Sequence, residues 1–532
     1  MRRSTKNYWN FIGVVLLVYF LALAIIAANE NREITLKMTP GIDPTISLGW
    51  YIAIAVLGAL ALGGIIWAIV SKNNKLKFRE VIKNKKDNLM LLAGPVLGAG
   101  GASLLGFFLI GSMPQFQISV PRGEVAQTDP MNGQTPETVY QAPIPDLPPL
   151  LPVKNLVDMA TGVLTISDQQ TIYGDYTASQ PNQSCLLALD QSAVTVDQAS
   201  FSKTGDPTSI DDARRYGLNA ALLAAPGATI NVLGATVHTA ASGAGGIAVN
   251  GLNASAISNA TNINTEGANS PVFFTAFQGE LKVTGGNQAS KGDSSPIFAP
   301  RASSSILADS VICQTTGYLA PIMRVAGLFS GTSLEAVATN SIAAQIEPGG
   351  TVNLVNSSLT AGAVQTDTNY HAVFVFDNQD NTQKHEPGHL TIINSEWEIP
   401  SSSPASQDGY NFIVDQCSAA ISLNGNTIIN VPKCARVQNG SIGLTLSQQV
   451  LGGVIEGDEN STVDLTISEA SRFDGAINPD QACKEAIVHL DASSTMNLTA
   501  DIYLTEFTNE NTSNSNVQTN GHHLYVNGQA IL

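Results

Sequence analysis

Basic residues are scarce in most of this chain. Only 14 of its 26 Lys and Arg follow residue 113, together with 38 of its 43 Asp and Glu. Residues 114–532 therefore carry a formal charge of −24, whereas residues 1–113 carry +7. A surface this acidic predicts no nucleic-acid partner and repels a polyanionic sugar unless calcium intervenes. The two parts differ in chemistry, and we expect them to be separate domains.

The sequence also lacks the patterns that bind metals. The closest histidines among the seven are His385-Glu-Pro-Gly-His389 and His522-His523. Proline and glycine inside the first group exclude two histidines on one helical face. The calcium-binding nonapeptide of β-rolls is missing as well. We expect no cofactor, with weak surface Ca²⁺ sites built from Asp and Asn as the alternative.

Signs of catalytic chemistry are equally few. Lyases acting on acidic polysaccharides need basic side chains, and in residues 114–532 only Arg214-Arg215 are adjacent. Hydrolases need carboxylates brought together, and the acidic doublet Asp211-Asp212 lies in a charged segment that is typical of a solvated loop. The sequence therefore predicts no catalytic residue.

All five cysteines follow residue 113. Cys417 and Cys434 would form a disulfide if they faced each other on successive turns of the fold, which an oxidising compartment permits. The alternative is that the cysteines are free thiols packed in the core as small apolar residues. The odd number favours free thiols slightly, and neither alternative implies catalysis.

Residues 1–113 have the pattern of a membrane anchor with three helical spans. Residues 11–28, 48–70 and 89–113 contain no charged residue, and each run is long enough to cross a bilayer. Basic residues precede the first span and fill the loop between the second and third, so both segments should be cytoplasmic. Everything after residue 113 should then lie outside the cytoplasm. The first span could alternatively be a cleaved signal peptide ending near Ala22-Leu-Ala24.

Residues 114–153 form the predicted linker. Nine of these 40 residues are proline. Proline-rich segments favour the extended polyproline conformation, so this stretch should act as a spacer outside the membrane.

Residues 154–532 contain a repeat of 25 residues. It is clearest in Gly267-Ala-Asn-Ser-Pro271, Gly292-Asp-Ser-Ser-Pro296 and Gly317-Tyr-Leu-Ala-Pro321. Short alternating runs rich in Thr, Ser, Asn, Val and Ile precede these segments, which indicates strands rather than helices. A unit of this size cannot bury its own apolar face, so the units must stack.

The predicted fold of residues 154–532 is therefore all-β, a right-handed parallel β-helix with coils of about 25 residues. Val272, Ile297 and Ile322, each next to a repeated proline (Pro271, Pro296, Pro321), should form one inward column. Residues 493–532 depart from the repeat and should cap the open end of the stack, since an exposed edge invites association.

Several segments resemble one group of proteins. They are the Gly-x-x-Ser-Pro coils, Tyr216–Leu223, Leu465–Ile477, Leu490–Asp501 and Asn520–Tyr525. From about residue 162 to the end, the chain resembles bacterial surface proteins with right-handed, pectate-lyase-like β-helices, described as adhesin-like. The membrane segment lies outside this resemblance. The resemblance implies the fold strongly and the function weakly, because most of that group lacks an assigned activity.

Two functions follow as expectations. The first is a multi-pass protein of the cell membrane whose outer β-helix acts in surface display or adhesion by binding a glycan or a surface protein, without catalysis. The alternative is a carbohydrate-active enzyme, a lyase or glycoside hydrolase, working on a neutral polysaccharide. The shortage of basic residues and of carboxylate clusters favours the first.

Overall fold

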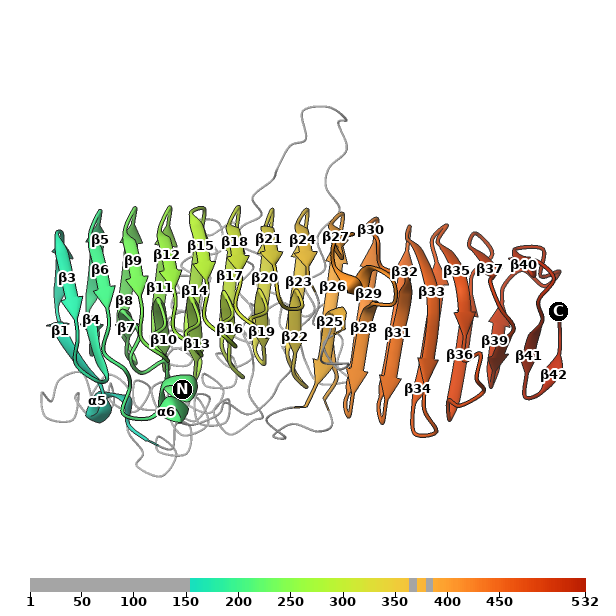
Figure 1. The fold of residues 1–532 in the computed structure, drawn as a ribbon, viewed down its shortest axis with the longest axis horizontal. Helices are drawn as coiled ribbons and strands as arrows, with labels where there is room; N and C mark the ends of the chain where they lie inside the picture. The colour runs from blue at the N-terminus through green and yellow to red at the C-terminus, as the bar shows by residue number, and fades with distance from the viewer. Residues whose placement is uncertain (1–153, 363–370, 379–385) are drawn as a thin grey trace, which may run out of the picture. The chain divides into compact units, whose positions relative to one another are not determined.

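The computed structural model describes residues 154–362, 371–378 and 386–532. They form a parallel β-solenoid of the right-handed type with about 14 turns, in which successive turns lie side by side (Figure 1). Most turns contribute one strand to each of three long sheets, called A, B and C in chain order. The predicted all-β parallel helix is confirmed for these residues.

Sheet A has 15 strands, and its core-facing side chains share the interior with those of the other sheets. The strands are β1 (Thr161–Ile166), β4 (Gln183–Ala188), β7 (Leu222–Ala224), β10 (Ile247–Asn250), β13 (Phe273–Ala276), β16 (Phe298–Pro300), β19 (Met323–Val325), β22 (Ala344–Ile346), β25 (Ala372–Asp377), β28 (Tyr410–Asp415), β31 (Lys433–Gln438), β33 (Val450–Gly457), β35 (Arg472–Ile477), β37 (Thr495–Leu498) and β40 (Val517–Gln518).

Sheet B has 14 strands and alternates between buried and exposed residues, as expected for a sheet with one solvated face. The strands are β2 (Gln169–Ile172), β5 (Ala193–Asp197), β8 (Thr229–Leu233), β11 (Ser255–Asn259), β14 (Glu280–Thr284), β17 (Ser305–Asp309), β20 (Leu328–Thr332), β23 (Thr351–Val355), β26 (Gly388–Ile393), β29 (Ser418–Asn424), β32 (Ser441–Ser447), β34 (Thr462–Ser468), β36 (Glu485–Leu490) and β39 (Glu506–Asn509).

Sheet C has 10 strands and ends before sheets A and B do. The strands are β3 (Asp175–Ala178), β6 (Ser200–Lys203), β9 (Thr236–Thr239), β12 (Asn262–Thr265), β15 (Asn287–Ser290), β18 (Ile312–Thr315), β21 (Glu335–Ala338), β24 (Ser358–Ala361), β27 (Glu396–Glu398) and β30 (Thr427–Ile429). A fourth sheet at the carboxyl end contains β38 (Ile502–Leu504), β41 (Leu524–Val526) and β42 (Gln529–Ala530). Strand β42 pairs antiparallel with β41, unlike the other paired strands of the described residues.

Three short helices complete the described elements: α5 (Leu156–Met159), α6 (Ile210–Tyr216) and η2 (Pro404–Ser406). Tyr216 of α6 packs in an apolar cluster with Leu223, Ala248 and Phe274, whose side chains point away from the solenoid interior. The strands β7, β10 and β13 are consequently buried on both faces.

Close backbone stacking explains the repeated glycines. A Cβ atom on Gly292 would lie 1.8 Å from the carbonyl oxygen of Gly267, and one on Gly317 would lie 2.0 Å from that of Gly292. Both distances are far inside van der Waals contact, so any side chain would force the turns apart. The 25-residue spacing of these glycines follows from one turn resting directly on the next.

Candidate functional site

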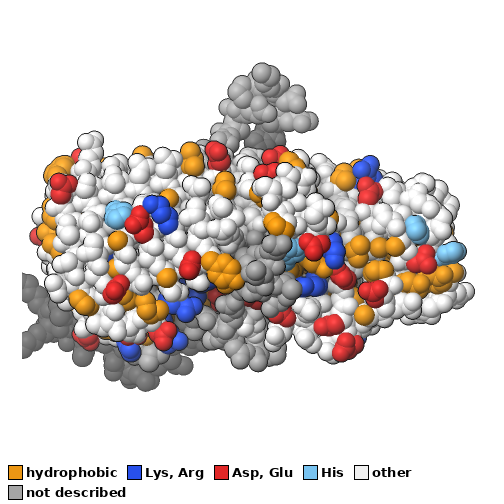
Figure 2. All heavy atoms as spheres, viewed as in Figure 1, with side chains coloured by type: hydrophobic (Ala, Val, Ile, Leu, Met, Phe, Trp, Pro, Cys, Tyr) orange, Lys and Arg blue, Asp and Glu red, His pale blue; other side chains and the backbone are white. Residues whose placement is uncertain are grey.

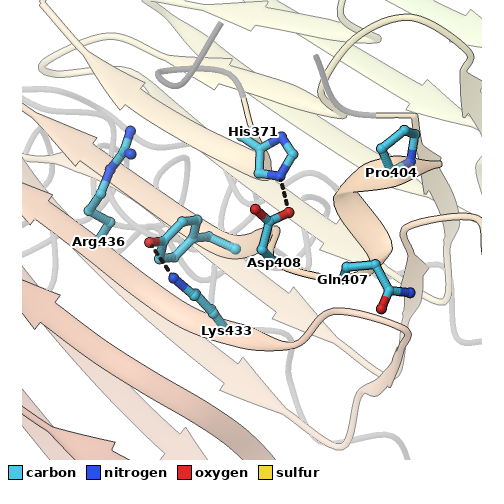
Figure 3. Close-up of a pocket in the computed structure, with 7 residues that line it drawn as sticks. His371, Pro404, Gln407, Asp408, Lys433 and Arg436 are labelled. Carbon is cyan, nitrogen blue, oxygen red and sulfur yellow. Dashed lines mark hydrogen bonds and ion pairs between the residues drawn. The ribbon is translucent and has the colours of Figure 1, made fainter. Parts of the chain in front are cut away.

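A pocket of about 550 Å³ opens beside strands β25, β28 and β31. Strand residues and connecting segments both contribute to its wall (Figure 3). The lining residues are His371, Pro404, Gln407, Asp408, Tyr410, Lys433 and Arg436. Figure 2 shows acidic and basic side chains close together on this face, over the turns of β28 to β33.

The pocket residues of sheet A lie on its outer side, where β28 departs from strict alternation. Phe412 of β28 belongs to the solenoid core, whereas Tyr410 and Ile413 of the same strand join a small separate apolar cluster. Tyr410 is in register with Lys433 on the next turn, and Ile413 with Arg436. Neighbouring turns therefore place a phenol, an ammonium and a guanidinium on one surface.

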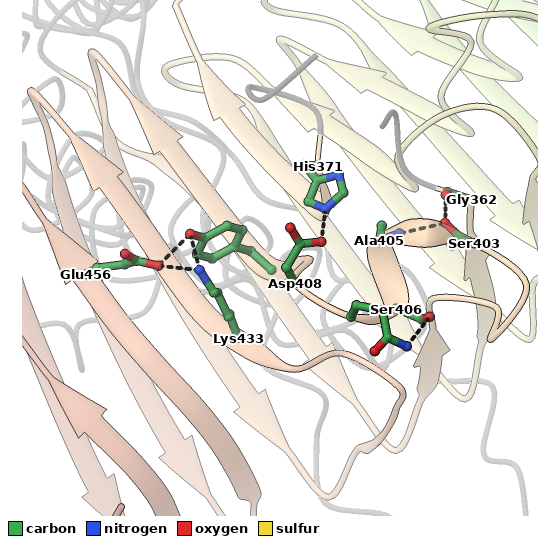
Figure 4. A network of polar contacts seen from close by, with 10 residues as sticks. Gly362, His371, Ser403, Ala405, Ser406, Asp408, Lys433 and Glu456 are labelled. Atoms are coloured by element: carbon green, nitrogen blue, oxygen red, sulfur yellow. Dashed lines mark hydrogen bonds and ion pairs between the residues drawn. The ribbon is translucent and has the colours of Figure 1, made fainter. Parts of the chain in front are cut away.

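A polar network holds Tyr410 in place (Figure 4). Its hydroxyl donates to Glu456 Oε1, and Lys433 Nζ lies 3.0 Å from both of these oxygens. Burial, and then the hydrogen bond to Glu456, raise the pKa of Tyr410. Burial opposes the charge of Lys433, but its hydrogen bonds to Tyr410 and Glu456 outweigh that effect and raise its pKa. The phenol therefore stays protonated and the amine charged at neutral pH.

The opposite wall comes from the segment that precedes β28. His371 Nε2 lies 2.7 Å from Asp408 Oδ1, and Ser403 Oγ donates to the carbonyl of Gly362 at 2.6 Å. Asp408 is mostly exposed, with 67% of its side chain accessible, whereas His371 is largely covered. The wall thus presents hydrogen-bonding groups on a segment anchored to the preceding turn (Figure 4).

A row of three carboxylates lies at the carboxyl-terminal ends of neighbouring sheet A strands, namely β22, β25 and β28. Asp377 is in register with Asp415, and Glu347 directly follows β22 on the preceding turn. Gln345 Nε2 donates to both oxygens of Asp377 at 2.9 Å, and Arg301 lies 3.6 Å from Glu347. Parallel strands are about 4.8 Å apart, so these three carboxylates occupy consecutive turns of one surface.

The carboxylates differ in their environments. Burial raises the pKa of Asp415, Arg436 opposes this effect and Asp458 adds to it. Burial opposes the charge of Asp458, but hydrogen bonds from Ser461 Oγ and the Asn460 amide at its own corner, and from the Asn439 amide of the preceding turn, lower its pKa. Asp458 therefore stabilises a corner, whereas Asp415 is a carboxyl group that resists ionisation.

Sequence reasoning missed both the pocket and this row. The acidic residues are 30 and 38 positions apart (Glu347, Asp377, Asp415), so no local motif joins them. The sequence does contain a signal for this row, because each acidic residue directly follows a short apolar run: Ile346-Glu347, Phe376-Asp377 and Val414-Asp415. Only the register of sheet A brings these ends together.

The acidic doublet Asp211-Asp212 lies in helix α6, not in a loop as predicted. Ser209 caps the helix by accepting a hydrogen bond from Asp212, and the two acids occupy the first turn. Their charges complement the positive end of the helix dipole. Asp212 also forms an ion pair of 2.8 Å with Lys154. These contacts give the doublet a structural role.

The predicted inward column lies in the solenoid interior. Val272, Ile297 and Ile322 have no exposed surface, and all belong to the main core cluster. The amide of Val272 donates to the carbonyl of Pro296, and that of Ile297 donates to Ile322. The prolines Pro271 and Pro321 immediately precede two of these residues at the entry to sheet A.

All five cysteines are free thiols, so the structure agrees with the alternative of unpaired thiols rather than with a disulfide between Cys417 and Cys434. Cys434 follows Lys433 on β31, which pairs with Tyr410, whereas the carbonyl of Cys417 accepts from the amide of Ser441 on the next turn. Cys417 therefore lies at the corner between β28 and β29, whereas Cys434 lies within β31.

The histidines singled out by the sequence lie apart from the pocket. His389 is on β26 of sheet B, and His522 and His523 lie 3.9 and 3.8 Å from Asp501 near the carboxyl end. His385 lies outside the described residues. Within residues 154–362, 371–378 and 386–532, no three His, Cys, Asp or Glu side chains are placed to hold a metal ion.

The described part of the chain contains no helix long and apolar enough to span a bilayer. The three predicted spans and the linker 114–153 fall outside it, so the anchor stays a prediction.

Comparison with known proteins returned no match: no protein-family model, curated protein or solved structure matches the chain.

Proposed function

We propose that this chain is a membrane-tethered surface protein whose β-solenoid binds a glycan in the pocket beside β25, β28 and β31. The observation that carries this proposal is the mixed lining of that pocket. It combines an aromatic floor (Tyr410) with donors (Lys433, Arg436) and an exposed acceptor (Asp408).

A glycan matches this lining chemically. A sugar offers hydroxyl groups that both donate and accept, so it needs donors and acceptors close together. Ligand sites are concave, with a few convergent polar groups on a partly apolar wall. Lys433, already bonded to Tyr410 and Glu456, supplies such groups in a fixed geometry. This agrees with an adhesion role.

The proposal of a membrane tether is based on the sequence. Three uncharged runs in residues 1–113 and a proline-rich segment in 114–153 would hold the solenoid away from the membrane. The distribution of basic residues favours an outward solenoid. Protease added to intact cells should then cut within residues 114–153 and release the carboxyl-terminal part. Protection of this segment in unbroken spheroplasts would contradict the topology.

Glycan binding is tested with the full chain in detergent on a glycan array. The variant carrying Gln407→Ala and Asp408→Ala should lose binding, because both residues line the pocket from an exposed segment. Glu459→Ala, in an exposed turn outside the lining, is the matched control. An array on which no glycan binds, or a double variant that binds as before, would contradict the proposal.

Glycoside hydrolysis is a second candidate, favoured by the register of Asp377 with Asp415. Retaining glycosidases hold two carboxyl groups about 5–5.5 Å apart, close to the spacing of neighbouring strands. Asp415, whose pKa is raised by burial, would be the acid, and Asp377 the carboxylate. Neutral polysaccharides are the expected substrates. Release of reducing ends that Asp415→Asn abolishes would establish this activity, and binding without release would exclude it.

A further inference from the structure

We propose that the pocket recognises its glycan through a carboxylate on the sugar, as in a chain that ends in a uronic acid. This inference rests on the proposed glycan-binding function and adds the class of ligand. The pocket wall carries Lys433 and Arg436 as permanent cations and a histidine, His371, against a single carboxylate, Asp408.

The carboxylates that balance these cations lie outside the lining. Glu456 meets Lys433 at 3.0 Å from the neighbouring strand β33, and Asp415, which lies toward the other end of β28, interacts with Arg436. Asp408 is engaged with His371 at 2.7 Å. The surface that faces a ligand is therefore richer in positive charge than the region around it. Figure 3 shows Lys433 and Arg436 among the lining residues.

This local excess stands out because cations are rare here. Residues 114–532 contain 14 Lys and Arg, and two of these line one pocket from the same strand, three residues apart. The negative charge of the whole domain acts over a range that physiological salt limits to about 8 Å. A long polyanion would still meet carboxylates along the solenoid, whereas a single terminal carboxylate would meet mainly these cations.

Tyr410 fixes the two cations relative to each other. Lys433 Nζ lies 4.8 Å from the centre of the Tyr410 ring, and the guanidinium carbon of Arg436 lies 5.4 Å from it. Cations held against an aromatic ring lose little further freedom when a ligand binds. An arginine fork pairs with a carboxylate through two parallel hydrogen bonds, and a lysine adds a point charge.

The inference is tested by calorimetric titration of the full chain in detergent with two matched oligosaccharides. They are identical except that one ends in a uronic acid and the other in its methyl ester, which has no charge. We expect the acid to bind roughly tenfold or more tightly, as for a charged hydrogen bond. Lys433→Met and Arg436→Met should each remove most of this preference.

The variant Glu456→Gln distinguishes a site for a sugar carboxylate from a site for neutral sugars. It removes the charge that competes for Lys433 while keeping a similar shape, so affinity for the acid should rise and affinity for the ester should stay unchanged. Arg472→Met is the control, because Arg472 pairs with Asp474 on β35 outside the pocket lining. If Glu456→Gln weakens binding of the acid, or the two sugars bind equally to the unmodified chain, the inference is overturned and glycan binding stands. If neither sugar and no other glycan binds, the proposed function itself fails.

Discussion

The turns from β13 to β19 and the turns from β22 to β31 enclose the same apolar core but differ in length. In the first region, core residues in register on sheet A, such as Phe273, Phe298 and Met323, recur every 25 residues. In the second, Phe374 and Phe412 are also in register but stand 38 residues apart. The interior is equally buried in both regions, and most of the added residues lie outside it, although Ala405 of the longer corner packs against the core.

Those added residues build the candidate site. Glu398 is in register with Ile429 and Tyr410 with Lys433, so residues 399–409 span the corner that residues 430–432 span one turn later. Three pocket residues, Pro404, Gln407 and Asp408, come from this longer corner. A solenoid tolerates such insertions because extending a surface loop costs little free energy. The regular turns form the stable stack, and the longer corners of the irregular turns carry residues of the candidate site.

The largest effect is expected from Ile297→Asp in the regular turns. Ile297 has no exposed surface, so an unpaired carboxylate would enter the core and cost about 4 kcal/mol or more. The measurement is the midpoint of thermal unfolding of the purified chain. Ile312→Asp is the control, because 51% of Ile312 on β18 is exposed. An unchanged midpoint for Ile297→Asp would show that the turns are stacked differently.

A smaller loss is expected from Gly292→Ala, which tests the close approach of the regular turns. The new methyl group would meet the Gly267 carbonyl, and we expect a cost of roughly 2–4 kcal/mol in urea unfolding. At Gly443 the nearest atom to an added methyl is 3.9 Å away, so Gly443→Ala should cost almost nothing. Equal effects of the two substitutions would argue against tight stacking.

Shortening the long corner should separate stability from binding. Replacing residues 400–409 with Val-Pro, copied from Val431-Pro432, should change the free energy of unfolding by only about 1 kcal/mol. Glycan binding should disappear, because the replaced segment carries three pocket residues. Both are read from one preparation by urea unfolding and titration. Retained binding would place the site elsewhere on the solenoid.

The smallest effect is expected from Asp415→Asn in the irregular turns. Because burial raises the pKa of Asp415 in the folded chain, the folded state disfavours its charged form. The native carboxyl thus contributes stability at acid pH that is lost as pH rises through the raised pKa. Relative to native protein, Asp415→Asn should be slightly more stable at pH 7, by less than about 1 kcal/mol, and lose this advantage below about pH 4. Urea unfolding at both pH values measures the difference. A variant that is less stable at pH 7 would indicate that the ionised carboxylate is stabilising.

Much of the fold was readable from the sequence, because in a solenoid neighbouring turns are also neighbours in the chain. The 25-residue repeat of glycine and proline defined the turn, and alternation defined the strands of sheets B and C. The helix α6 was missed because its seven residues are too short for a clear period. The choice between a disulfide and free thiols for Cys417 and Cys434 stayed open because the sequence does not state where the two residues lie across the turns.

The sequence by itself determined the kind of protein: an acidic, repetitive β-chain after a basic, apolar first part. Tertiary structure alone decided which polar residues meet. Tyr410, Lys433 and Glu456 are brought together because strand pairing aligns residues across turns of unequal length. Composition and repeat length can be read from the identity of each residue and its position in the chain. A site depends on distances between residues, and in this chain insertions of irregular length determine those distances.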